Sequence, residues 1–531
     1  MTTSTARAKV EAPGEDARVQ LWTLGAQELT ARFARGECSA VDAVEAHIAR
    51  IEEVDATLHA MVVKRYDAAR EEARAADRRR AAGEPLGPLA GVPITIKECL
   101  DLEGTPSTFG LPSRRNTLAT TDDPYVARLR RAGAIVLGKT NVAQLLFYFE
   151  SDNPTYGRTV NPWDGERTPG GSSGGQAAII AAGGSAIGLG TDLAGSNRVP
   201  AAFCGVVGLK PTAGRLPDLG RLSAPYGQRA IVSQVGVFGR SVADAALTLE
   251  VVNGGKDPQD GTPRPLRDFA AVDITRVRVG VWRDDGTLPA AAACVRAVDE
   301  AAQTLRARGA KVVEFAPPGL PEALEILYRV VIADHGKGLR RTLGKNPRDP
   351  RIKQLELAGT ASRPVLALLR VALKLSGRGQ AARLLGLYGD YDTDAFWQLS
   401  ERLLDYQERW ARALDEQQVD VLLSPATALP ALRHGASLEL GVMGAYSCIY
   451  NVLGWPAGVV PVTRVRAAEE TSTRRGERDV AERTARATER GSAGLPIAVQ
   501  LAARPWREDL ALAAMAAVEA GASERSVTWE A

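Results

Sequence analysis

Two neighbouring segments concentrate the residues that could carry chemistry. Residues 168–176 have the sequence TPGGSSGGQ, and residues 190–205 have the sequence GTDLAGSNRVPAAFCG. Glycine and serine at this density suit a flexible linker, a phosphate cradle or a site with a serine nucleophile. A linker is disfavoured because the small residues at 177–187 predict a closely packed helix. A phosphate cradle of the dinucleotide-binding kind is disfavoured because no G-x-G-x-x-G follows a strand here. The residue types alone leave the serine site and its alternatives open.

A third motif supplies a base for such a site. Residues 92–97 have the sequence VPITIK, and Lys97 lies 75 residues before Ser172, which lies 24 residues before Ser196. A serine hydroxyl is a poor nucleophile until a base takes its proton, and lysine is a base only when neutral. Ile94 and Ile96 on a buried strand would desolvate Lys97 and lower its pKa. A serine between base and nucleophile can pass the proton in both directions.

The three motifs, in this order and followed by GLKPT at 208–212, resemble the amidase-signature family. The resemblance implies that Ser196 is the nucleophile, that Ser172 is a bridging serine in a cis peptide bond, and that Lys97 is the base. It implies an acyl-enzyme and neither a cofactor nor a metal. We expect the oxyanion hole to be formed by backbone N–H groups, each worth about 3 kcal/mol. The expected donors are Leu193, Ala194, Gly195 and Ser196, and the expected supporting residues are Ser173, Asp192 and Arg198, the last two bracing the loop rather than doing chemistry.

The sequence departs from the family pattern at two positions. Ala194 stands where the family usually has glycine, and Asn197 stands where a branched apolar residue is common. If residue 194 requires a positive φ, alanine adds roughly 1 kcal/mol of strain. Both changes bear on the oxyanion hole and leave open whether water or an amine accepts the acyl group.

The C-terminal half narrows the substrate. Residues 450–463, residues 494–500 and the following Arg-Pro-Trp at 504–506 resemble the fatty acid amide hydrolases of this family. The likeness runs from about residue 85 to 515. It implies hydrolysis of a linear, hydrophobic and even fatty-acyl amide. The alternatives are an amide-forming acyltransferase of small-molecule biosynthesis, an amidotransferase A-type subunit that releases ammonia from glutamine, and a catalytically dead binding protein.

One apolar and basic segment is independent of these motifs. Residues 365–375 are apolar apart from Arg370 and Lys374, and residues 357–389 contain no acidic side chain. Such a helix suits an anionic membrane surface, where the resemblance implies a cap over the acyl channel. It also suits a core or dimer-interface helix whose two charges reach outward. The segment is too short and too charged to span a bilayer.

The elements around the motifs predict an α/β protein. Short apolar runs at 92–96, 134–137, 276–282, 419–423, 458–465 and 496–502 predict buried strands separated by helices. The fold class is therefore the amidase-signature fold, a large twisted mixed sheet with helices on both faces. We divide the chain into an N-terminal helical segment packing on the core (1–84), an α/β domain (85–515) and a C-terminal tail (516–531). The domain includes the apolar basic cap (361–388) and a charged surface insertion (464–491).

Bulk composition excludes several classes of protein. The 531 residues carry 66 basic and 63 acidic side chains, a balance that argues against a nucleic-acid partner. Five dispersed cysteines indicate a reducing compartment without disulfides, and four scattered histidines indicate no metal site. The first 15 residues lack a signal-peptide pattern. We expect a cytoplasmic protein with a small-molecule amide substrate. Any membrane contact is expected to be peripheral, at the inner face of the membrane. The sequence leaves open whether the protein is a homodimer.

Overall fold

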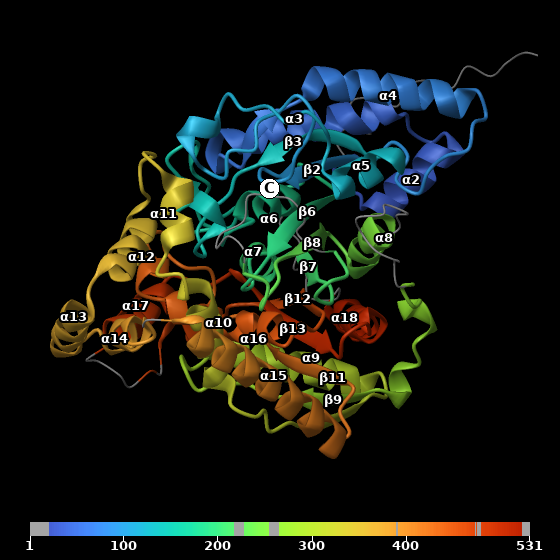
Figure 1. Ribbon diagram of the computed structural model, residues 1–531. Helices are drawn as coiled ribbons and strands as arrows, with labels where there is room; N and C mark the ends of the chain where they lie inside the picture. The colour runs from blue at the N-terminus through green and yellow to red at the C-terminus, as the bar shows by residue number, and fades with distance from the viewer. Residues whose placement is uncertain are drawn as a thin grey trace, which may run out of the picture.

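A mixed sheet of eleven strands organises the computed structural model, which describes residues 21–216, 228–253, 265–388, 391–472, 474 and 479–522 (Figure 1). The strand order is β1-β3-β2-β6-β8-β7-β12-β13-β11-β9-β10. In chain order the strands of this sheet are β1 (Met61–Lys64), β2 (Pro93–Lys97), β3 (Ile135–Thr140), β6 (Ile187–Asp192), β7 (Val207–Lys210), β8 (Gln234–Gly239), β9 (Arg278–Val281), β10 (Lys311–Glu314), β11 (Val421–Pro425), β12 (Ala457–Arg464) and β13 (Pro496–Ala503). The predicted fold class is confirmed, and each of the six predicted strands is present.

Strand direction explains where the chemical motifs meet. β2 pairs in parallel with β3 and with β6, whereas β6 pairs antiparallel with β8. In the β2–β6 ladder, Thr95 lies opposite Gly188 and Ile96 opposite Leu189. Because parallel strands end at the same edge of a sheet, Lys97 at the end of β2 and Asp192 at the end of β6 share that edge. The loops that follow them are brought together there.

Helices cover both faces of the sheet (Figure 1). The helices are α2 (Ala26–Arg35), α3 (Ala40–Leu58), α4 (Tyr66–Ala81), α5 (Pro124–Arg131), α6 (Gly174–Ala181), α7 (Arg198–Cys204), α8 (Val242–Asn253), α9 (Ala292–Ala307), α10 (Leu320–Ile332), α11 (Lys337–Leu343), α12 (Pro350–Thr360), α13 (Arg363–Leu375), α14 (Gly379–Leu385), α15 (Thr393–Glu416), α16 (Ala445–Val452), α17 (Val480–Glu489) and α18 (Glu508–Ala522). Two of them, α6 and α7, begin within the two serine motifs, shortly after Ser172 and Ser196, and pack against each other. The site therefore lies where strand ends meet helix starts.

The helix boundaries refine the sequence-based expectations. α3 begins with a capping box, in which the Ser39 hydroxyl accepts from the Asp42 amide at 2.9 Å. The small-residue helix expected over 177–187 ends at Ala181 instead, because the chain turns at Gly183 with φ of +91° and then enters β6. The N-terminal helical segment also contains β1, which pairs with β3. α18 continues to Ala522, past the start of the predicted tail, and residues 523–531 lie outside the described part of the chain.

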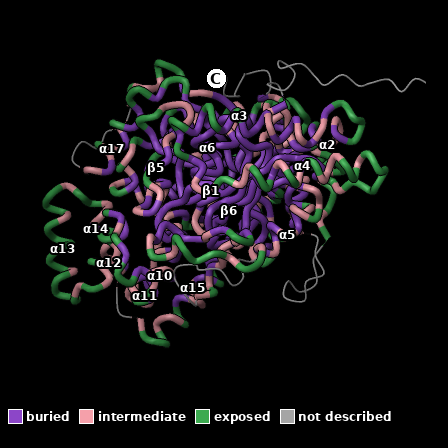
Figure 2. The backbone as a smooth tube through the Cα atoms, turned by 90° about the horizontal axis from the view of Figure 1, so that it is seen from above, coloured by how far each residue is buried: buried purple, intermediate pink, exposed green. Residues whose placement is uncertain are grey.

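The apolar basic segment forms α13, which has no buried residue. Leu368 is 71% exposed and Leu375 is 84% exposed. Figure 2 shows α13 as an exposed strip at the edge of the molecule, outside the buried centre. A core helix is therefore the wrong interpretation of this segment.

No helix in the described residues is both long and apolar enough to cross a membrane. The five cysteines are free and buried. Within the same residues, no group of three or more His, Cys, Asp and Glu side chains could hold a metal ion.

Candidate active site

Lys97 lies at the end of β2 with its amine inside the protein. The residue is fully buried, and Nζ lies 2.8 Å from Oγ of Ser172 and 2.7 Å from Oγ1 of Thr191. Thr191 is the penultimate residue of β6, so the parallel pairing of β2 with β6 brings it beside Lys97. Sequence reasoning did not identify Thr191, although it precedes the recognised Asp192.

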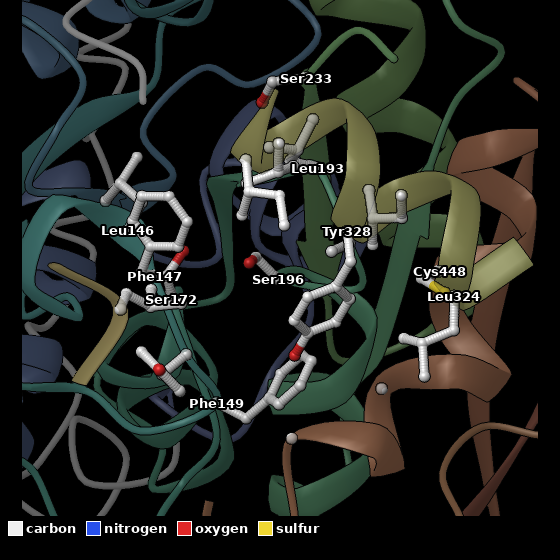
Figure 3. Close-up of a pocket in the computed structure, with 18 of the residues that line it drawn as sticks. Leu146, Phe147, Phe149, Ser172, Leu193, Ser196, Ser233, Leu324, Tyr328 and Cys448 are labelled. Atoms are coloured by element: carbon white, nitrogen blue, oxygen red, sulfur yellow. The ribbon is translucent and has the colours of Figure 1, made fainter. Parts of the chain in front are cut away.

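Ser172 and Ser196 line the same cavity (Figure 3). The Gly171–Ser172 peptide bond is cis, as the resemblance implied. A Cβ on residue 171 would lie 2.5 Å from the backbone nitrogen of Glu150, so only glycine fits there. The Ser173 amide donates to the carbonyl of Ser196 at 3.2 Å, which ties the two serine segments together. The structure thus brings Lys97 against Ser172 and places Ser172 and Ser196 on one cavity wall.

A buried ion pair holds the loop that carries Ser196. Asp192 and Arg198 are both fully buried, with Arg198 Nε 3.0 Å from Oδ2 of Asp192. The same carboxylate accepts from the amides of Gly195 at 2.7 Å and Asn197 at 3.2 Å. Burial by itself would raise the pKa of Asp192, but the Arg198 charge and hydrogen bonds hold it well below its ordinary value. These contacts connect both side chains to the loop that carries Ser196.

Arg198 also connects this loop to the C-terminal half of the chain. Its guanidinium donates to the carbonyl of Ser447 at 2.7 Å, to Oε1 of Gln500 at 2.6 Å and to Oδ1 of Asn451 at 2.6 Å. Asn451 and Gln500 belong to segments that the sequence had singled out for their resemblance, but not for this role. An amide side chain can accept and donate hydrogen bonds at once. This property is the only sequence signal that could have placed Asn451 and Gln500 beside a buried charge.

The four amides expected to form an oxyanion hole are not equivalent. The Gly195 amide is engaged by Asp192, and Gly195 has φ of +107° with a prospective Cβ only 2.6 Å from Cβ of Ser447. Leu193, Ala194 and Ser196 line the cavity. Ala194 does not have a positive φ, so the strain anticipated for alanine at this position is absent.

Asn197 faces the sheet rather than the cavity. Its side chain is fully buried, and Nδ2 donates to the carbonyl of Val237 in β8 at 3.0 Å. Ser173 lies on the same side, with Oγ 3.4 Å from the Thr191 carbonyl. The second departure from the family pattern therefore changes packing beneath the loop and leaves the cavity wall unaltered.

The cavity has a volume of about 130 Å³ and a mostly apolar wall. One side is the segment 146–149, in which Leu146 and Tyr148 have positive φ values of 62° and 70°. The opposite side is α10, which contributes Leu324, Leu327, Tyr328, Val331 and Ile332. The polar side-chain groups are hydroxyls and the Cys448 thiol, and none of the described side chains that line the cavity is acidic, basic or imidazole. Sequence analysis predicted neither wall, because both segments have the ordinary appearance of apolar packing.

The chain is similar to known proteins along most of its length. A family model described as Amidase matches residues 42–512. Fatty-acid amide hydrolase 1 of Sus scrofa is 35% identical over 461 residues, covering 83% of this chain and 76% of that protein. The A-type subunit of the glutamyl-tRNA(Gln) amidotransferase of Salinispora tropica is also 35% identical, over 466 residues, covering 83% of this chain and 91% of that protein.

Solved structures show the same arrangement of elements. A fatty acid amide hydrolase superimposes with a TM-score of 0.81 at 25% identity, covering 95% of this chain and 86% of that one. A 6-aminohexanoate cyclic dimer hydrolase, solved with its substrate, superimposes with a TM-score of 0.73 at 25% identity, covering 96% of this chain and 100% of that one.

Proposed function

This chain belongs to the amidase-signature family of hydrolases that act on amides, and we propose that it cleaves a linear amide with a neutral, hydrophobic acyl group through an acyl-enzyme on Ser196. The observation that supports this substrate class is the uncharged, largely apolar cavity beside Ser196. An apolar wall with a few converging hydroxyls suits a ligand whose only polar group is the amide being cleaved.

In the first step, the buried Lys97 amine is neutral and accepts a proton. Burial favours the neutral amine because a buried ammonium loses its hydration. The Ser196 hydroxyl gives its proton to Ser172, and Ser172 gives its own to Nζ of Lys97, 2.8 Å away. The freed Oγ of Ser196 forms a bond to the amide carbon, and the carbonyl oxygen takes up the negative charge. Backbone N–H groups at 193, 194 and 196 are assigned to that oxygen, since the one at Gly195 binds Asp192.

In the second step, the carbon–nitrogen bond breaks. The leaving nitrogen takes a proton from Ser172, which takes one back from Lys97, so the amine departs neutral and an ester on Ser196 remains. A water molecule then gives a proton to the same relay, attacks the ester and releases the acid. The proton returns to Ser196, and all three side chains regain their starting states.

Cavity size and charge define the preferred acyl group. An apolar cavity of about 150 Å³ accommodates benzene, so about 130 Å³ suits an acyl group close to ring size. A long chain requires lining side chains such as Tyr328 to move aside. Free glutamine carries an ammonium and a carboxylate, and burying them without partners costs several kcal/mol. The cavity therefore favours a hydrophobic amide over the glutamine expected of an amidotransferase.

The test is a substrate panel read by product and by protein mass. Benzamide, hexanamide, dodecanamide and L-glutamine are supplied to the wild type and to Ser196→Ala, with free acid, ammonia and intact protein mass measured. We expect hydrolysis of the first two, slower hydrolysis of dodecanamide, none of glutamine and none by the variant. Hydroxylamine added to the same reactions detects transfer to an amine as hydroxamate. Glutamine turnover above that of every apolar amide contradicts the proposal.

We also propose that α13 contacts a membrane surface peripherally. Its exposed apolar side chains include Leu368 and Leu375, and Arg370 and Lys374 supply charges that attract anionic headgroups. Co-sedimentation with phosphatidylglycerol vesicles should be reduced by Leu368→Asp. Leu404→Asp is the matched control, because Leu404 is 59% exposed on α15. Equal losses in both variants, or no vesicle binding by the wild type, contradict the contact.

A further inference from the structure

A second cavity lies among α10, α13, α14 and α15, apart from the catalytic one. Its volume is about 660 Å³, and it is open to solvent on one side. Four arginines line it, namely Arg329, Arg363, Arg370 and Arg402, and no carboxylate does so among the described residues. Tyr388, Tyr391, Gln398, and leucine, alanine and glycine residues complete the wall. None of the motifs considered above accounts for this concentration of guanidinium groups.

Two of the arginines are held in place from behind. Arg329 Nε lies 3.0 Å from Glu325, and its Nη1 donates to the Tyr391 hydroxyl at 2.8 Å. Arg402 Nε lies 2.8 Å from Glu322. The carboxylates of Glu322 and Glu325 are not part of the cavity wall. These ion pairs orient the two guanidinium groups and reduce the conformational entropy that a ligand would otherwise have to remove.

The third arginine is positioned by a glycine. Arg370 approaches the end of α14 so closely that a Cβ on Gly386 would lie 2.9 Å from its Cζ. Gly386 has φ of −68°, so its role is to leave space rather than to permit an unusual backbone. The last turn of α14 presents carbonyl oxygens, which attract a cation. Arg370 is thereby drawn over the cavity, whereas Lys374, one turn later on α13, does not line it.

The two cavities are separated by a single helix. Leu324, Leu327 and Tyr328 of α10 line the catalytic cavity, while Arg329 of the same helix lines the arginine-rich one. In Figure 1, α13 and α14 lie at the outer edge of the molecule, away from the sheet and its serine motifs. The arginine-rich cavity is therefore a distinct site, and its ligand does not compete with the amide for the same space.

We propose that this cavity binds a phosphate group. The guanidinium groups that line this space carry N–H donors that match phosphate oxygens. Arg329 and Arg402 are paired with Glu325 and Glu322, and the remaining positive charge suits an anion that carries close to two negative charges. The tyrosines and apolar side chains can contact an organic body attached to that phosphate. The group can come from a soluble phosphate ester or from a phospholipid headgroup beneath the exposed α13. The proposal does not depend on the amide chemistry at Ser196.

The experiment is calorimetric titration of the full-length protein with inorganic phosphate and with glycerol 3-phosphate at low salt. We expect one binding site in the wild type. Arg370→Gln should weaken it about tenfold, because a charge-assisted pair of hydrogen bonds is lost. Gly386→Ala should weaken it similarly by displacing the guanidinium while retaining its charge. Lys374→Gln, the matched control, removes one charge from the same helix outside the cavity and should change affinity less than about twofold.

Two results overturn the site: no measurable binding of either phosphate, or equal weakening by Arg370→Gln and Lys374→Gln, which would indicate only general charge attraction. Sedimentation with phosphatidylglycerol vesicles then identifies the source of the phosphate. A greater loss for Arg370→Gln than for Lys374→Gln, reversed by glycerol 3-phosphate, assigns the lipid headgroup. Equal vesicle losses alongside site-specific phosphate binding assign a soluble ester.

Discussion

Thr191→Val tests whether the Lys97 amine must be held in one orientation. Nζ lies 2.7 Å from the Thr191 hydroxyl and 2.8 Å from that of Ser172. Valine has nearly the same shape and removes only the hydroxyl. The lost hydrogen bond is worth about 1 kcal/mol, which corresponds to about a fivefold reduction in kcat if it is fully expressed in the transition state. We expect KM to stay within about twofold, since Thr191 also lines the cavity but valine keeps the shape of that part of the wall.

Thr95→Val supplies the matched control. Thr95 is also fully buried, lies on the same strand as Lys97, and accepts a hydrogen bond from Nε2 of Gln176 at 2.7 Å. Both substitutions should lower the free energy of unfolding by about 1 kcal/mol, measured by urea titration. Steady-state hydrolysis of the best amide should then show a reduced kcat for Thr191→Val only. Equal kcat values for the two variants would refute the orienting role and leave Thr191 as an ordinary core residue.

Three further outcomes follow from buried groups. Asp192→Asn leaves its arginine partner uncompensated and should lower the free energy of unfolding by about 3–5 kcal/mol at neutral pH. In the wild type, the stabilisation from this carboxyl is present above about pH 4. It is lost in acid as the pH falls through the depressed pKa of Asp192 in the folded protein. Gly195→Ala should abolish activity, because residue 195 has φ of +107° and its added Cβ would lie 2.6 Å from Cβ of Ser447. Ala194→Gly should change the free energy of unfolding by less than about 1 kcal/mol. Thermal melting and amide hydrolysis are measured for both variants. Burial raises the pKa of Asp285 to about 7, so as the pH rises this carboxyl ionises in the unfolded chain before it does so in the folded protein. The free energy of unfolding should therefore fall by about 1 kcal/mol per pH unit between about pH 4 and 7. Asp285→Asn should remove this contribution from urea unfolding midpoints measured across that range, and an unchanged slope contradicts the assignment.

The candidate motifs could be located in the sequence because they are short and local. Ser172 and Ser196 are surrounded by glycines whose spacing reflects close backbone contacts, such as the 2.5 Å that a Cβ at Gly171 would leave to Glu150. Lys97 could be predicted because it ends an apolar strand. The strands β7 and β8 escaped prediction, since their glycine-rich sequences lack a continuous β-branched run.

Long-range partners were beyond sequence reasoning. Arg198 contacts Asn451 and Gln500, which lie about 250 and 300 residues further along the chain, and no local pattern joins them. Whether residue 194 has a positive φ could not be predicted for a similar reason, because the φ of one loop residue depends on how the surrounding loop is held. The helical character of α13 followed from its sequence, but its full exposure required the tertiary arrangement.

In the mechanism we propose, Lys97, Ser172 and Ser196 form one proton relay that ends in an acyl-enzyme. The most direct test is rapid-quench intact-mass spectrometry of the wild type, Ser196→Ala and Lys97→Met during reaction with a benzoyl amide, with peptide mapping of the adduct. We predict a benzoyl group on Ser196 in the wild type, none in Ser196→Ala, and acylation slowed by about a hundredfold or more in Lys97→Met. A benzoyl group on another residue, or acylation of Lys97→Met at the wild-type rate, would contradict the account.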